Sequence, residues 1–199
     1  MNNKNLTIKE TFTSAVQNHQ KNFFKIAENL YKEILKINPN HFGSIFYLGT
    51  LLVQTQRFKL AKSLLYKATQ INPNYAAAHN NLGATLKELG EYQNAINCCQ
   101  KAIKINPNYA DAHYNLGLVF KELGEFKKAI SCFKKAIQIH PSYINAHQNL
   151  MEAYEKTNQE RELKSAISNA QTLIKDNSII KLYEGILLSR NEKFVEAKN

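Results

Sequence analysis

The stretch NPNYADAHYNLGLVFKELGEFKKAISCFKKAIQI, from Asn106 to Ile139, repeats much of the preceding stretch, from Asn72 to Ile105. The only prolines in the chain lie at positions 39, 73, 107 and 141, so successive prolines are 34 residues apart. A period of this length indicates an array of stacked structural units. The polar segment NPNYADAHYNLG, at positions 106–117, is therefore interpreted mainly as part of a packing unit.

Within each unit the apolar residues have helical spacing. Leu82, Leu86 and Leu89 lie four and three residues apart, and apolar residues occupy the same places 34 positions later. Gly90 and Gly124 follow these segments and can adopt the left-handed conformation that ends a helix. A second apolar-periodic segment follows each glycine and stops before the proline, which cannot continue a helix. The sequence therefore predicts helix–turn–helix units.

This pattern resembles the tetratricopeptide repeat family. Small residues stand where two helices would cross closely, and larger ones fill the gaps. The matching columns are Leu82/Leu116, Gly83/Gly117, Leu86/Phe120, Ala95/Ala129, Cys99/Phe133, Ala102/Ala136 and Pro107/Pro141. The resemblance implies an all-α, right-handed solenoid, or superhelix, of antiparallel helix pairs.

We expect residues 1–199 to form one array of about five and a half repeats. The expected units are 8–41, which is divergent, followed by 42–75, 76–109 and 110–143. Residues 144–177 form a degenerate unit, because Met151 and Asn158 stand where the other units have glycine. A partial unit, 178–199, ends inside its second helix.

Three asparagines, Asn81, Asn115 and Asn149, share one column of the first helices. In tetratricopeptide arrays the first helices line a concave groove, so the resemblance places this column in the ligand space. An Asn side chain both donates and accepts, which suits a peptide main chain of any sequence. The other candidate groove residues are Asn80, Tyr114, Leu118, Glu122, Lys87 and Lys121. The chain is therefore predicted to be a protein–protein interaction scaffold for an extended peptide.

Such an asparagine column is similar to the repeat domain of O-linked N-acetylglucosamine transferases and related bacterial repeat–transferase proteins. That similarity implies an alternative, in which the chain is the substrate-recruiting N-terminal region of a larger modifying enzyme. The carboxylate clamp that holds chaperone C-termini needs Lys and Asn at set groove positions. Here those positions hold Phe46 with Thr50, Asn80 with Ala84, and Tyr114 with Leu118, so this mode is disfavoured.

No residue pattern points to catalysis, a metal ion or a cofactor. His79, His113 and His147 share one column. Successive packed helices lie about 8–10 Å apart, whereas zinc needs nitrogens about 2 Å from one ion. We therefore interpret this column as packing, and the glycines as repeat glycines rather than a phosphate-binding loop.

The formal net charge of +10 raises nucleic acid as a second alternative partner. Because many of the lysines lie at helical surface positions, a solvated face is the favoured interpretation and nucleic-acid binding is not expected. The start of the chain has no uninterrupted apolar run typical of a secretory signal, and no segment is long and apolar enough to span a membrane. The odd number of cysteines, three, fits a reducing cytoplasm.

The C-terminal segment SIIKLYEGILLSRNEKFVEAKN, at 178–199, carries apolar residues on more than one helical face. A terminal repeat usually has a polar outer face. The apolar excess therefore suggests self-association through this end, or continuation of the natural chain.

Overall fold

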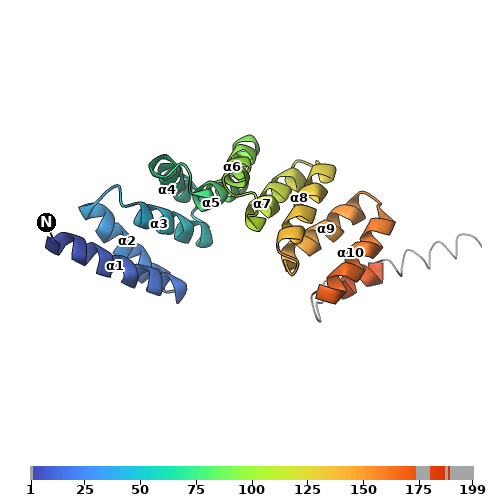
Figure 1. The fold of residues 1–199 in the computed structure, drawn as a ribbon, viewed down its shortest axis with the longest axis horizontal. Coiled ribbons are helices and arrows are strands. Elements are labelled where there is room, and N and C mark those ends of the chain that lie inside the picture. Colours follow the sequence, from blue (N-terminus) through green and yellow to red (C-terminus); the bar gives the residue numbers. More distant parts are fainter. Residues whose placement is uncertain (1, 174–179, 187, 189–199) are drawn as a thin grey trace, which may run out of the picture. The chain divides into compact units, whose positions relative to one another are not determined.

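The computed structural model describes residues 2–173, 180–186 and 188, and every regular element in these ranges is a helix (Figure 1). Residues 180–186 and 188 are helical as well. The other helices are α1 (Asn2–Gln20), α2 (Phe24–Ile37), α3 (Phe42–Gln54), α4 (Phe58–Ile71), α5 (Ala76–Glu88), α6 (Tyr92–Ile105), α7 (Ala110–Glu122), α8 (Phe126–Ile139), α9 (Ile144–Lys156) and α10 (Glu160–Leu173). The first helix begins ahead of residue 8, where the first repeat was expected to start.

The chain divides into two compact units, Met1–Pro107 and Asn108–Asn199. The first unit contains α1 to α6 and the second contains α7 to α10. Within each unit, from α1 to α6 and from α7 to α10, every helix packs against the next one along the chain. Because the connections are short, consecutive helices run antiparallel. The all-α fold of antiparallel helix pairs predicted from the repeat is confirmed.

The first helices of the first unit lie side by side. Helices α1 and α3 pack against each other directly, as do α3 and α5. Among the described residues, the second helices α2, α4 and α6 have no comparable mutual contact. We call the exposed side of α1, α3 and α5, together with the corresponding side of α7 and α9 in the second unit, the first-helix face.

A left-handed residue lies in the turn of every helix pair from α1/α2 to α9/α10. Gly90 has φ 74° and Gly124 has φ 72°, as the sequence predicted. The same column holds Asn22 (φ 62°), Gln56 (φ 58°) and Asn158 (φ 54°) in the other pairs. Asparagine tolerates this conformation better than most residues, whereas for glutamine it is strained. Loss of the glycine at 158 therefore leaves the helix–turn–helix geometry intact.

The second helices end where the prolines predicted. Helices α2, α4, α6 and α8 each end two residues before a proline, at Ile37, Ile71, Ile105 and Ile139. The backbone N–H of the next residue still bonds the helix, as Asn106 N does to the Ala102 carbonyl oxygen at 2.9 Å. The proline then prevents a further turn because it has no N–H to donate.

A glycine in each of three first helices allows close packing against the paired second helix. A Cβ at Gly83 would lie 2.6 Å from Cys99 Sγ, and one at Gly117 would lie 2.6 Å from Phe133 Cε1. Cys99 and Phe133 are fully buried. In the pair α9/α10 the same place is taken by Met151, which is 1% exposed and fills the core instead.

The partial repeat expected at 178–199 lies largely outside the described residues. Of its apolar residues, Ile180 and Tyr183 are buried, whereas Leu182 and Leu188 are about 60% exposed. Self-association through this end remains a prediction. No helix among the described residues has the length and apolar character needed to cross a bilayer.

Candidate functional site

Asn81, a predicted groove residue, joins two successive first helices. Its Nδ2 donates to the Thr50 Oγ1 of α3 at 3.0 Å, and its Oδ1 accepts from the Asn80 Nδ2 at 3.4 Å. Asn80 is only 4% exposed. Of this pair, Asn81 therefore presents more of its side chain on the first-helix face, and it already holds two bonds there.

Asn149 lies at the centre of a polar cluster in the second unit. Its Oδ1 accepts from Lys121 Nζ at 2.7 Å. Its Nδ2 donates to the Tyr114 hydroxyl at 3.2 Å and to the Asn145 carbonyl oxygen at 2.9 Å. The side chain is 8% exposed, so its amide hydrogens are engaged and shielded from water. The structure thus brings together Asn149, Tyr114 and Lys121.

The remaining predicted residues lie on α5 and α7. Asn115 and Leu118 are partly buried on α7, and Glu122 is exposed at its end. Asn115 has interactions within the molecule. Lys87 of α5 forms an ion pair with Glu88, 2.6 Å between Nζ and Oε1. Each of the three asparagines of the predicted column therefore has a partner in the protein itself.

Lys121 also links the cluster to acidic charge. Its ammonium lies 2.9 Å from Glu152 Oε2 on α9. A second contact on this side joins the Tyr143 hydroxyl to Asp111 Oδ1, which accepts at 2.8 Å. Burial is the largest cause that raises the pKa of Tyr143, and its hydrogen bond to Asp111 is the second largest. The Tyr143 hydroxyl therefore stays protonated at neutral pH. The first-helix face of the second unit therefore carries both signs of charge.

The first unit contains an aromatic cluster that the sequence argument did not single out. The Tyr31 and Tyr47 rings stack with centroids 6.3 Å apart, and Phe12 meets both rings edge-on or tilted. His19, 8% exposed, lies against Tyr31 and Tyr47 as well. The repeat pattern did not predict this cluster, because the first repeat is divergent. The high density of aromatic residues between positions 12 and 47 is the feature of the sequence that could have indicated it.

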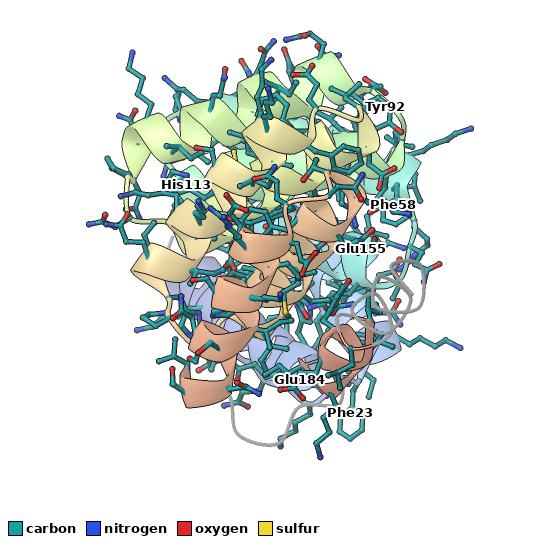
Figure 2. All side chains as sticks on the ribbon, turned by 90° about the vertical axis from the view of Figure 1, so that its right-hand side faces the viewer. Phe23, Phe58, Tyr92, His113, Glu155 and Glu184 are labelled. Atoms are coloured by element: carbon teal, nitrogen blue, oxygen red, sulfur yellow. The ribbon has the colours of Figure 1, made fainter. Side chains whose placement is uncertain are left out.

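The histidine column does not form a metal site in the described part of the chain. His79 Nε2 donates to the Pro73 carbonyl oxygen at 2.9 Å, and His147 Nε2 donates to that of Pro141 at 2.7 Å. His113, labelled in Figure 2, holds the corresponding place on α7. No group of three or more His, Cys, Asp or Glu side chains in the described ranges could hold a metal ion. His79 and His147 each connect their helix to the turn that precedes it through the hydrogen bond to the proline carbonyl oxygen.

The cysteines show no sign of activation. Burial raises the pKa of both the Cys98 and the Cys132 thiol to about 11. A thiol with such a pKa is almost entirely protonated at neutral pH and is a poor nucleophile. Cys99 is fully buried against Gly83 and belongs to the core.

The lysines gather on the second helices. Among the first helices of the helix pairs, α3 has no charged residue, and α5 and α7 have one lysine each. The second helix α8 alone carries four lysines, at 127, 128, 134 and 135. The basic surface therefore lies mainly on helices other than those of the first-helix face.

Ion pairs connect the second helices α2 and α4 to the N-cap residue of the next second helix along the chain. Arg57 donates both to Glu28 Oε1, at 3.0 Å, and to Glu28 Oε2, at 2.6 Å. The pKa of Glu28 is lowered to about 2, mainly by the hydrogen bonding from Arg57 and to a smaller extent by the hydrogen bond from Lys32. One repeat later the same two columns form an ion pair with the charges exchanged, in which Lys62 Nζ lies 2.6 Å from Glu91 Oε1. These contacts stabilise the stacking of neighbouring helix pairs.

Comparison with known proteins agrees with the geometry. Models described as tetratricopeptide repeat match residues 44–75, 64–97 and 110–143, and a model described as TPR repeat matches residues 85–124. No curated protein matches the chain.

Several solved structures share the fold. A crystal structure of MamA is 33% identical, with a TM-score of 0.72, and the match covers 79% of this chain and 92% of that one. The structure of Pseudomonas aeruginosa pilF is 18% identical, with a TM-score of 0.81, and covers 94% of this chain and 86% of that one. YrrB, described as a TPR protein with an unusual peptide-binding site, is 19% identical, with a TM-score of 0.69, over 88% of this chain and 90% of that one.

The 34-residue period, the helix pairs with their left-handed turns, and these matches agree with one another. The chain belongs to the tetratricopeptide repeat family.

Proposed function

We propose that this chain is a protein–protein interaction scaffold that binds an extended peptide along its first-helix face. The observation that carries the proposal is the contrast between the two sides of the helix pairs. The first helices present amide, hydroxyl and aromatic groups, whereas most lysines lie on the second helices. A peptide main chain needs both donors and acceptors, and amide side chains supply both. The peptide-binding site described for YrrB, a protein of the same fold, is consistent with this function.

In this proposal Asn81, Asn115 and Asn149 exchange part of their internal bonding for bonds to the peptide backbone. Asn81 can do so more easily than Asn149, because its bond to Asn80 is long, at 3.4 Å. Asn149 would have to release Lys121, whose ammonium can stay bound to Glu152. An exchanged bond contributes at the low end of the usual range, about 0.5 kcal/mol. Useful affinity therefore requires several contacts in register, including those of Leu118 and Tyr114.

Site-specific crosslinking tests this proposal. A benzophenone amino acid replaces Leu118 on the first-helix face or, as a control, Leu60 on α4, which is 60% exposed. Each variant is irradiated with a mixture of random dodecapeptides, and crosslinked products are identified by mass spectrometry. We expect several-fold more peptide captured at position 118. Equal capture at both positions would contradict binding on the first-helix face.

The two alternatives make different predictions. Nucleic-acid binding would be carried by the lysine-bearing second helices, and its affinity would fall steeply as salt rises. If the affinity for a short DNA duplex depends only weakly on salt, or if no binding is measured at low salt, nucleic-acid binding is refuted. A role as the substrate-recruiting part of a larger modifying enzyme predicts that captured peptides include that enzyme's substrates. We propose neither catalysis nor a cofactor for the chain itself.

A further inference from the structure

A small pocket opens on the first-helix face of the first unit, between α1 and α3. Its volume is about 280 Å³, and it lies within one compact unit. Its walls include Val16, His19 and Gln20 from α1, and Tyr47, Thr50 and Gln54 from α3. A hydrogen bond from Asn81 to Thr50 connects its edge to the predicted asparagine column.

Three of the polar side chains around the pocket, those of His19, Thr50 and Gln54, already form hydrogen bonds. His19 Nε2 lies 2.7 Å from Gln54 Oε1, and His19 Nδ1 lies 3.3 Å from the Tyr31 hydroxyl. Since the amide oxygen of Gln54 can only accept, the Nε2 atom carries the proton and Nδ1 accepts from Tyr31. The Thr50 hydroxyl donates to the Phe46 carbonyl oxygen and accepts from Asn81, both at 3.0 Å. Thr50 therefore presents its methyl group, and Val16 adds a second apolar wall.

Polar groups on four of the lining side chains remain open. The side-chain amides of Gln20 and Asn22 are exposed at the pocket and have no hydrogen bond among the described residues. The Tyr47 hydroxyl and the Gln54 Nε2 have no hydrogen-bond partner among the described residues, although the Tyr47 ring is held by four aromatic neighbours. The Gln54 amide is itself oriented by its bond to His19. The pocket thus offers one oriented N–H donor, one hydroxyl that can donate or accept, and two exposed side-chain amides at its edge.

The charge of the lining selects among possible occupants. No described residue lining the pocket is Asp, Glu, Lys or Arg, and α3 carries no charged residue at all. A carboxylate or an ammonium entering this pocket would lose water without gaining a counter-charge. An aliphatic group would displace water from the Gln54 N–H and the Tyr47 hydroxyl without offering either of them a hydrogen bond. A primary carboxamide supplies an acceptor for Gln54 and a donor for Tyr47, and its methylenes fit against Val16 and the Thr50 methyl.

We infer that this pocket binds the carboxamide side chain of an Asn or Gln residue. The inference deepens the proposed function, because the side chain would belong to a peptide lying along the first-helix face. It assigns the first unit the recognition of one neutral polar side chain. The charged first-helix face of the second unit would make different contacts.

The test uses the full chain, labelled with nitrogen-15, and N-acetyl-L-glutamine methylamide as the probe. Matched probes carry glutamate, lysine or norleucine in place of glutamine, all at pH 7.5. We expect the glutamine probe to shift backbone amide signals within 16–22 and 47–54, and to bind at least about 5-fold more tightly than the glutamate probe. Equal shifts from all four probes, or none from glutamine, would overturn the inference.

Two variants locate the binding. Tyr47→Phe keeps the ring and its aromatic contacts but removes the hydroxyl, so the glutamine probe should bind roughly 3- to 10-fold more weakly. Val16→Phe fills the pocket and should abolish the shifts. Tyr66→Phe is the control, because Tyr66 is 59% exposed on the second helix α4, and should leave binding unchanged. Binding that survives both Tyr47→Phe and Val16→Phe would place the probe elsewhere and refute the assignment.

This experiment separates the inference from the proposed function. Peptide capture at Leu118 takes place in the second unit and does not require the pocket. Capture there, together with absent probe binding here, would refute only the carboxamide pocket. Absent capture with specific probe binding would refute the extended peptide mode and leave the pocket as an independent site.

Discussion

Replacing Gly117 by alanine should destabilise the second unit, because the added Cβ has no room. It would lie 2.6 Å from Cε1, 2.8 Å from Cδ1 and 3.1 Å from Cζ of the Phe133 ring. Phe133 is fully buried, so its ring cannot swing into solvent. Overpacking of this kind costs about 1–3 kcal/mol. For a chain of this length each kcal/mol lowers Tm by about 2–4 °C.

Gly185 provides the matched control in the same repeat column. A Cβ added there would meet no atom of the described structure within 4 Å. Because Gly185 lies outside α7 and α8, Gly185→Ala should leave the stability of those two helices unchanged. Urea unfolding followed by circular dichroism measures both variants, and hydrogen exchange assigns the loss to α7 and α8.

A double substitution tests the physical cause. Phe133→Leu alone should destabilise the core by leaving a cavity. Combined with Gly117→Ala, it should cost less than the sum of the two single changes by at least about 0.5 kcal/mol, because the smaller side chain makes room for the methyl group. Additive effects, or a Gly117→Ala variant as stable as Gly185→Ala, would refute the close-packing explanation of the glycine column.

Further predictions concern the turns, the polar cluster and pH. Gln56→Gly should stabilise the protein by roughly 0.5–1 kcal/mol in urea unfolding, because glycine removes the strain at φ 58°, and Asn158→Gly should gain less. Asn149→Ala should destabilise by about 1–3 kcal/mol in the same assay, since it removes the hydrogen-bond partner of the partly buried Tyr114 hydroxyl, Lys121 ammonium and Asn145 carbonyl oxygen. The lowered pKa of Glu28 contributes stability above the ordinary carboxyl pKa of 4.5. That contribution should disappear as pH falls toward about 2, and an Arg57→Met variant should show a smaller loss of stability over the same pH range.

Much of the local structure could be predicted from the sequence. The prolines mark the ends of the second helices, and Gly90 and Gly124 mark the turns, because these residues restrict or extend what the backbone can do. Helical spacing of apolar residues then places the core side chains. The divergent first repeat shows where this approach weakens: Asn22 adopts the turn conformation without glycine, so its helix pair carries a fainter signal.

The candidate site was predicted less completely, for a physical reason. A column of asparagines identifies positions on one side of the first helices, but it does not say which partners those side chains choose. Asn149 is hydrogen-bonded to Tyr114 and Lys121, which lie 35 and 28 residues away in sequence. These residues come within hydrogen-bonding distance only when the helix pairs stack. The pocket beside Tyr47 likewise depends on His19 meeting Gln54 across two helices.

The amino-acid sequence by itself determined the repeat, the helix pairs and the turns, because each depends on residues close together in the chain. Only the tertiary structure decided which polar groups are satisfied internally and which stay open to a ligand. Hydrogen bonds form over about 3 Å, and the stacking of whole helix pairs sets those separations.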